Sequence, residues 1–185
     1  NFIDYIIADK ILIPKESQKY YSEKIVYLPN TYQARDSSLK ISDKIFEREE
    51  LGLPKNAFVF CCFNQNNKIT PNIFDIWMRI LKTVDKSVLW LLEDNSIAVK
   101  NLRKEAKKRK IDPKRIVFAK HMPMPDHFAR HKCADLFIDT FPYGAHTTCS
   151  DALWAGLPIV TLRGKSFASR VASSLLNAIN LKKLI

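Results

Sequence analysis

Two patterns of apolar residues alternate along the chain from Ala57 to its end. Short, continuous apolar runs rich in Val, Ile, Phe and Trp predict strands, and the segments between them repeat their apolar residues with the period of a helix. We expect strands at residues 57–63, 87–92, 115–119, 134–139 and 157–162. We expect helices at residues 72–83, 96–111, 125–133, from about 147, and 166–179. The apolar face predicted for the first helix carries Ile73, Ile76, Trp77, Ile80 and Leu81.

This alternation predicts an α/β protein with a Rossmann-like, doubly wound and mostly parallel sheet. The strands are apolar throughout, as expected when helices cover both faces of a sheet. Ahead of the sheet we expect a strand, a short helix, a strand, an aperiodic polar linker and a second short helix, at residues 4–9, 14–23, 24–29, 31–42 and 43–51. Gly52 and Pro54 should end that second helix.

The composition narrows the classes of protein that fit. With 46% hydrophobic and 26% charged residues, the chain has the makings of a globular core. Lys and Arg number 30 against 19 Asp and Glu, a net charge of +11. A basic balance favours anionic partners such as nucleic acid, a membrane surface or a phosphate-bearing small molecule. A surface that merely keeps the protein soluble explains the charge equally well.

The cysteines and the ends of the chain bear on location. Cys61, Cys62, Cys133 and Cys149 have no CxxC spacing, so neither a disulfide scaffold nor a zinc site is expected. Free thiols fit a reducing cytosol, and we predict a cytoplasmic location. No apolar run approaches the roughly 20 residues of a membrane span, and no signal peptide is recognisable. No Met begins the chain, so we expect it to be a piece of a longer protein.

The loops that follow the predicted strands carry the candidate chemistry, because parallel α/β sheets bind ligands at the carboxyl ends of their strands. Neither GxGxxG nor a Walker A motif is present, which argues against a dinucleotide fold and a P-loop NTPase. The segment from His146 to Asp151 is rich in small polar residues where a helix begins. Thr147 or Thr148 is a natural N-cap with Asp151 near capping-box register, and the first N–H groups of a helix bind phosphate.

Plain helix capping explains that segment equally well when it is taken alone. Lys68 favours phosphate binding over plain capping, because it belongs to another strand-to-helix loop at the same sheet edge and would neutralise a phosphate. Gln65 adds a donor and an acceptor beside it. His127 and Arg130 lie three residues apart on one helical face, where they would stack on a nucleobase and bond its edge. Two ordinary surface residues are the alternative for that pair.

The chain resembles the carboxyl half of the O-GlcNAc transferase family, glycosyltransferases of the two-lobed GT-B fold with tetratricopeptide repeats ahead of the catalytic region. The resemblance runs from about Asp4 to the end and is carried by "FVFCCFNQNNKITP", "HMPMPDHFARHKCADLFIDTFPYGAHTTCSDALWAGLPIVTL" and "FASRVASSLLNAI". It implies that residues 1–35 end the amino-terminal lobe and form the interlobe linker. Residues 36–185 would be the Rossmann-like lobe that binds the donor, UDP-GlcNAc.

The resemblance also implies roles for individual residues. Those expected at the donor phosphates and the sugar are Gln65, Lys68, His146, Thr147 and Thr148, with Lys68 and His146 as the catalytic pair. Asp151 would hold the ribose, His127 and Arg130 would lie beside the uracil, and the backbone of Met122 would read the base edge. Met124 stands where the animal enzymes have a lysine near the ribose, so this chain departs from them there. The wording "FPYGAHTT" looks closer to bacterial members.

The reaction implied is transfer of GlcNAc from UDP-GlcNAc to Ser or Thr hydroxyls of proteins, with inversion at the anomeric carbon. Lys68 and the helix N-terminus would stabilise the departing UDP, and we expect neither a metal nor another cofactor. The protein acceptor would be met by the missing lobe and repeats, so the 185-residue chain alone should bind UDP but transfer sugar poorly or not at all. No membrane partner is expected.

Two alternatives stay open. An N-glucosyltransferase, or a small-molecule glycosyltransferase of the same fold, would use another UDP-sugar, and the donor loops do not separate these from the first reading. A nucleic-acid-binding module without catalysis would account for the basic segment "KNLRKEAKKRK". That segment has no interleaved aromatic residues to stack on bases, so nucleic acid is the less favoured partner.

Overall fold

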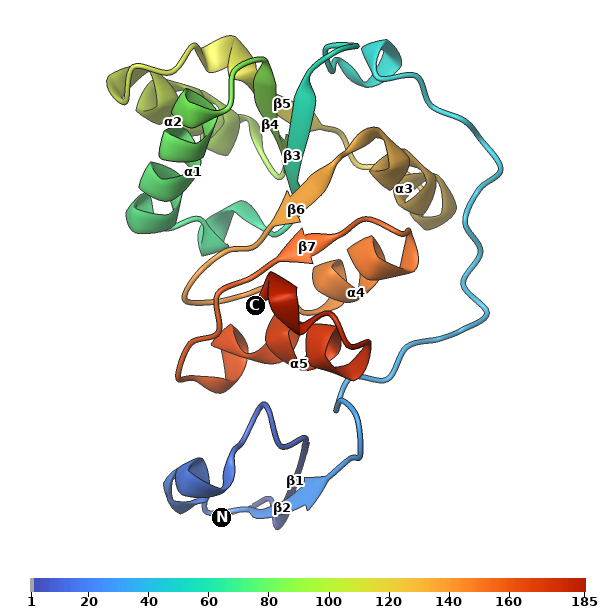
Figure 1. Cartoon of the computed structure of the whole chain (residues 1–185), viewed down its shortest axis with the longest axis vertical. Coiled ribbons are helices and arrows are strands. Elements are labelled where there is room, and N and C mark those ends of the chain that lie inside the picture. The colour runs from blue at the N-terminus through green and yellow to red at the C-terminus, as the bar shows by residue number, and fades with distance from the viewer. Residues whose placement is uncertain (1) are drawn as a thin grey trace.

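Five parallel strands form the central sheet of the computed structural model, which describes residues 2–185 (Figure 1). The strands are β3 (Phe58–Cys62), β4 (Ser87–Leu92), β5 (Ile116–Ala119), β6 (Leu136–Ile138) and β7 (Ile159–Val160). Their order across the sheet is β5-β4-β3-β6-β7, and every pairing is parallel. The chain therefore winds outward from β3 in one direction and then in the other, which confirms the predicted doubly wound sheet.

The helices cover both faces of this sheet. The main ones are α1 (Pro71–Thr83), α2 (Ser96–Lys108), α3 (Met124–Arg130), α4 (Thr147–Trp154) and α5 (Val171–Ala178). In Figure 1, α1 and α2 lie on one side of the strands and α3 and α4 lie on the other. The order of strands reverses between β3 and β6, so the loops after these two strands flank the crevice where such folds bind ligands.

Helix α1 shows how local sequence sets an element. Thr70 caps it by accepting a hydrogen bond from the Ile73 backbone N–H, and Pro71 occupies the first turn, where its missing N–H costs nothing. The buried stripe is wider than predicted and rotated, because Phe74 and Met78 join Ile73, Trp77 and Leu81 in the core. Ile76, expected on that face, is 39% exposed at its edge.

Several predicted helices and strands are shorter than the sequence patterns indicate. The expected helix at 43–51 is wrong: only a 3₁₀ turn forms, η2 (Glu49–Leu51). Arg48 accounts for the difference, since its guanidinium donates to the carbonyls of Ala57 and Cys133 and ties the segment to the core. The helix expected at 14–23 is also a 3₁₀ turn, η1 (Lys15–Tyr20).

The carboxyl-terminal elements are broken by tertiary hydrogen bonds. The helix expected at 166–179 is divided at Arg170 into a 3₁₀ turn, η6 (Phe167–Ser169), and α5. The guanidinium of Arg170 donates to the carbonyls of Gly164 and Ile11, which fixes the chain at that bend. The strand expected at 157–162 keeps only the two residues of β7 in the ladder.

The amino-terminal segment forms a small sheet of its own from β1 (Tyr5–Ala8) and β2 (Lys24–Tyr27). It packs on α5 through Ala8, Leu12 and Ile13, which are buried together with Val171. The division of the chain at residue 35 stays a prediction, and residue 1 of the expected 1–35 segment lies outside the described residues.

A buried carboxylate, Asp139, shapes the loop that leads from β6 into α4. Its Oδ1 accepts hydrogen bonds from the backbone N–H groups of Thr140 and Ala145, each at 2.7 Å, and from Asn64 Nδ2 at 3.2 Å. Its Oδ2 accepts from the Thr161 hydroxyl at 2.7 Å. Because the carboxylate binds both ends of the loop, it sets the position at which α4 starts.

We expect Asp139→Ala to lower the free energy of unfolding by about 3 kcal/mol or more, because four buried donors lose their acceptor at once. Urea denaturation of the purified chain measures this. Thr161→Val is the matched control, since it removes one of the four bonds and should cost about 1 kcal/mol. Equal losses in the two variants would contradict the assigned role of Asp139.

Candidate functional site

Lys68 lies at the edge of the sheet in a 3₁₀ turn, η3 (Asn66–Lys68), that follows β3. Its Nζ donates to the Gly144 carbonyl at 3.1 Å and lies 4.3 Å from the centroid of the Tyr143 ring. Burial lowers the pKa of Lys68, while the negative charge of Asp139 opposes that shift. Within residues 2–185 no carboxylate pairs with this ammonium, so its charge is available to an anion.

The turn that carries Lys68 is fixed from the neighbouring loop. The Asn66 backbone N–H donates to Asp94 Oδ2 at 2.6 Å, and its side-chain amide donates to the Leu92 carbonyl at 3.1 Å. Asp94, in the loop after β4, therefore holds the turn that carries Lys68. Gln65 is the residue before the turn, and its side chain is exposed. Together with Asn67, Lys68 and Tyr143 it lines a hollow of about 270 Å³.

The amino-terminal end of α4 faces the same edge, although its cap differs from the prediction. His146 is the N-cap, and its carbonyl accepts from the backbone N–H groups of Cys149 and Ser150. Neither threonine caps the helix, and Asp151 falls too far along α4 for a capping box, because the loop tied to Asp139 starts the helix one residue earlier. Within residues 2–185 the backbone N–H groups of Thr147 and Thr148 have no acceptor, so both are open to an anion.

The two threonine side chains have different surroundings. The Thr148 hydroxyl donates to Asn64 Oδ1, which orients the threonine and links α4 to the end of β3. The Thr147 side chain is exposed, and it has no hydrogen-bond partner among the described residues. Thr147 is therefore the hydroxyl of the pair that is free to donate to a ligand.

The ring of His146 stacks on Tyr143, with centroids 5.1 Å apart and planes 20° from parallel. Its Nε2 lies 3.3 Å from the Ala168 carbonyl, which only accepts, so Nε2 carries the proton in this arrangement. Burial lowers the pKa of His146, with Lys68 contributing in the same direction, and the neutral ring therefore presents Nδ1 as an acceptor. To donate to a phosphate, the ring would first have to leave Ala168 or gain a proton.

His127 and Arg130 form a second cluster beside the end of β3. The Arg130 side chain is 1% exposed, packed 4.6 Å from the centroid of the Phe63 ring, and it donates to the Lys120 carbonyl and to His127 Nδ1. Arg130 is thus buried beneath the site and does not face a ligand directly. Because guanidinium N–H groups only donate, Nδ1 must accept, and the proton of the neutral His127 ring sits on Nε2.

His127 stays neutral across the physiological range, since burial and the charge of Arg130 lower its pKa to about 3. Its half-buried ring is 5.2 Å from that of Phe63 and 4.7 Å from that of His131. Met122 precedes α3, and its backbone has no hydrogen-bond partner among residues 2–185, which leaves it open to a base edge. Met124 begins α3 and is 48% exposed.

Asp151 is 6% exposed and engages a residue that the sequence patterns did not single out. Arg35, from the expected linker, places Nη1 at 2.7 Å from Asp151 Oδ1 and at 2.8 Å from Ser150 Oγ. Burial raises the pKa of Asp151, and Arg35 opposes the shift. The ribose contact expected of Asp151 would therefore involve an ion pair and not a lone carboxylate.

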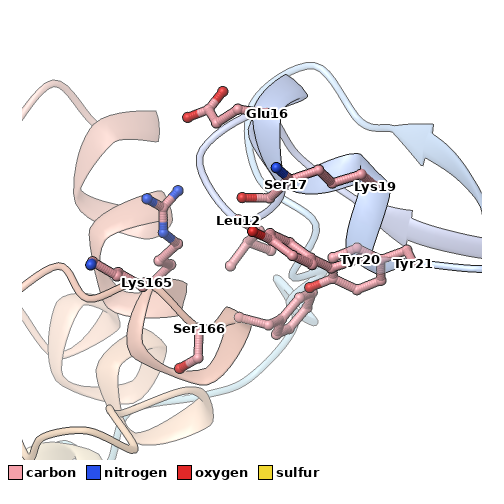
Figure 2. Close-up of a pocket in the computed structure, with 10 residues that line it drawn as sticks. Leu12, Glu16, Ser17, Lys19, Tyr20, Tyr21, Lys165 and Ser166 are labelled. Atoms are coloured by element: carbon pink, nitrogen blue, oxygen red, sulfur yellow. The ribbon is translucent and has the colours of Figure 1, made fainter.

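A separate hollow of about 690 Å³ lies between the amino-terminal segment and the loop before α5. Figure 2 shows Lys19, Tyr20 and Tyr21 on one wall and Lys165 and Ser166 on the other. None of the residues expected to bind the donor lines this hollow. Its link to the donor loops is through η6, which forms part of one wall. The Ala168 carbonyl of η6 accepts the hydrogen bond from the His146 ring.

Sequence reasoning missed the residues that position the site. Asp139 comes directly after β6 and Asn64 two residues after β3, so their places at strand ends were a usable signal. Tyr143, which contacts both Lys68 and His146, had only its nearness to the "HTT" segment to mark it. Arg35 had no signal, because its segment has no periodicity and its partners are more than a hundred residues away.

Two other kinds of feature, a metal site and a membrane-spanning helix, are absent from residues 2–185. Among residues 2–185, no three His, Cys, Asp or Glu side chains gather as a metal site would require. In that same part of the chain, every helix is too short or too polar to cross a bilayer. The four cysteines are buried free thiols, as far as the described residues show.

Comparisons with known proteins place this geometry in a family. The model of glycosyl transferase family 41 matches residues 40–185. A probable UDP-N-acetylglucosamine–peptide N-acetylglucosaminyltransferase SEC of Arabidopsis thaliana is 37% identical over 179 residues, which is 94% of this chain and 18% of that protein. A UDP-N-acetylglucosamine–peptide N-acetylglucosaminyltransferase of Caenorhabditis elegans is 43% identical over 138 residues, 75% of this chain and 12% of that protein. The chain thus spans less than a fifth of either relative.

Comparison with solved structures supports the same family. A mutant of the Thermobaculum terrenum O-GlcNAc transferase superposes with a TM-score of 0.84 and 30% sequence identity, covering 98% of this chain and 34% of that one. The likeness includes the α/β architecture with its parallel sheet, so the predicted fold class is confirmed. The resemblance to O-GlcNAc transferases is confirmed at the level of the family. This chain belongs to glycosyl transferase family 41, a family of glycosyltransferases.

Proposed function

We propose that this chain is the carboxyl-terminal, donor-binding lobe of a bacterial-type enzyme that transfers GlcNAc from UDP-GlcNAc to Ser or Thr hydroxyls of proteins. The observation that carries the proposal is the meeting of Lys68 with the open end of α4 at the crevice between β3 and β6. In the described part of the chain this ammonium has no carboxylate partner and the N–H groups of Thr147 and Thr148 have no acceptor, an arrangement that suits a diphosphate. The relatives named for transfer of N-acetylglucosamine to peptides support the choice of sugar and acceptor.

The two clusters fit the two ends of a nucleotide sugar. Lys68 and Gln65 would bind the phosphates together with the two threonines, and His146 would lie beside the sugar. At the other end the Nε2–H of His127 would donate to a uracil carbonyl, while Arg130 positions the ring from beneath. The open backbone of Met122 would complete the reading of the base.

The charge that develops on the departing UDP sets the catalytic requirement. Lys68 and the amino-terminal end of α4 are donors already in place before the bond breaks, and one such donor is commonly worth roughly 3 to 4 kcal/mol in a transition state. No metal or other cofactor is invoked, because these groups supply the positive potential. No side chain of this chain is assigned as the general base. The acceptor and its base would lie with the other lobe, in a parent protein with tetratricopeptide repeats that acts in the cytoplasm.

We expect Lys68→Ala to weaken UDP-GlcNAc binding by about ten- to a hundredfold, since a charge-assisted contact worth 1.5 to 3 kcal/mol is lost. Isothermal titration calorimetry of the purified chain measures the change. Lys82→Ala is the control, because Lys82 is an exposed lysine on α1, away from the site. If both variants bind like the unaltered chain, Lys68 does not contact the donor.

The purified chain should bind UDP-GlcNAc more tightly than UDP-glucose and yet transfer little or no sugar to peptides. Binding needs only the loops described above, whereas transfer needs an acceptor surface and a base that they do not provide. Calorimetry with both sugars and a radiolabelled transfer assay test the two halves separately. Preference for UDP-glucose would favour the N-glucosyltransferase or small-molecule alternative, and turnover at ordinary enzymatic rates would show that the chain is complete for catalysis.

A further inference from the structure

We propose that Arg35 is a positioning residue for donor binding: it holds the carboxylate of Asp151 so that the free oxygen accepts a hydrogen bond from the donor's ribose. This inference rests on the proposed binding of UDP-GlcNAc. It assigns a role in the donor site to the segment that precedes the lobe, and it makes the site depend on how that segment docks.

One end of the Arg35 guanidinium contacts α4. Its Nη1 bonds both Ser150 Oγ and Asp151 Oδ1, and its guanidinium carbon lies 5.3 Å from the Phe128 ring centroid and 5.2 Å from that of Trp154. The cation is therefore enclosed between rings of α3 and α4, the two helices that carry the expected base and ribose contacts. Within residues 2–185, Asp151 Oδ2 has no partner and is left to accept from a ligand.

Arg48 shows by contrast what a purely structural arginine does in the same stretch of chain. Its Nε, Nη1 and Nη2 each have an acceptor, in the carbonyls of Cys133 and Ala57 and the carboxylate of Asp135. In Arg35 the Nε and Nη2 groups are buried without partners among residues 2–185. A tether would be expected to satisfy these groups, because a buried donor without an acceptor is costly. All the polar contacts of the guanidinium within those residues come from Nη1, which bonds Ser150 Oγ and Asp151 Oδ1, and the carboxylate is the charged partner.

The charge of Arg35 matters because Asp151 is buried. Desolvation raises the pKa of the Asp151 carboxyl, and Arg35 is the group that opposes it. The other titratable group beside Asp151 is the Cys149 thiol on α4, whose pKa burial raises far above neutrality, so it carries no charge. Phe128 and Trp154 face the pair from α3 and α4 without charge. Without Arg35, burial would act unopposed and the carboxyl would hold its proton to higher pH.

The ionisation of Asp151 sets how donor binding depends on pH. An ionised carboxylate is the stronger acceptor for a ribose hydroxyl, so binding weakens as pH falls through the pKa of Asp151. Arg35 opposes the rise in that pKa, so in Arg35→Gln the fall in affinity should come at a higher pH than in the unaltered chain. UDP-GlcNAc suits the test because its diester phosphates do not titrate near neutrality, and His127 and His146 are neutral there because burial lowers the pKa of both.

The experiment is calorimetric titration of the purified chain with UDP-GlcNAc from about pH 5.5 to 8, for the unaltered protein and for Arg35→Gln, Arg35→Lys and Arg48→Gln. Arg35→Gln should bind within about threefold of the unaltered chain at pH 8 and should lose about threefold more affinity than the unaltered chain as the pH falls to 5.5. Arg35→Lys restores the charge and should restore the pH profile of the unaltered chain. Arg48→Gln should lower the melting temperature and leave that pH profile unchanged.

The possible outcomes separate the role of Arg35 from the proposed binding of UDP-GlcNAc. If the unaltered chain binds tightly and Arg35→Gln shows the same pH profile as the unaltered chain, this inference is overturned and the proposed function stands. Failure of the folded, unaltered chain to bind UDP-GlcNAc overturns both. If Arg35→Gln does not fold, Arg35→Met decides, because it removes the charge and keeps an apolar side chain between the rings of Phe128 and Trp154. A pH profile for Arg35→Met equal to that of the unaltered chain would then overturn the role of Arg35.

Discussion

The buried carboxylate of Asp139 is the constraint on which the candidate site depends. Four donors from three separate segments converge on it: the end of β3, the loop between β6 and α4, and the residue that follows β7. By drawing these segments together it fixes the start of α4 and the Gly144 carbonyl that receives Lys68. Its negative charge also opposes the loss of the proton from Lys68 that burial favours. One buried group thus sets both the geometry and the charge of the phosphate end.

The two ends of the site differ in their electrostatics. At the phosphate end an unpaired ammonium and open backbone N–H groups supply positive potential. At the base end the histidines are held neutral, because burial lowers the pKa of His127 to about 3 and that of His131 to about 4. Arg130 is buried against Phe63 and sets the tautomer of His127. A charged pocket for the diphosphate beside a neutral, aromatic-backed pocket for a base matches the two halves of a nucleotide.

Sequence patterns predicted the fold well because buried parallel strands are continuous apolar runs, and they placed Lys68 and His146 at one sheet edge through topology alone. Cap positions were less predictable: the start of α4 depends on Asp139, and neither threonine at that start acts as the cap. The helix predicted at 43–51 does not form, because the Arg48 side chain donates its hydrogen bonds to the distant carbonyls of Cys133 and Ala57. The burial of Arg130 and the pairing of Arg35 with Asp151 are tertiary contacts, which a period of three or four residues does not encode.

The central claim is that a nucleotide diphosphate sits between Lys68 and the amino-terminal end of α4. A crystal structure of the chain with UDP-GlcNAc tests it most directly. The account predicts density for the diphosphate within hydrogen-bonding distance of Lys68 Nζ and the backbone of Thr147 and Thr148, with the uracil against His127. Density for the ligand in the hollow of Figure 2 instead, between Lys19 and Lys165, would contradict it.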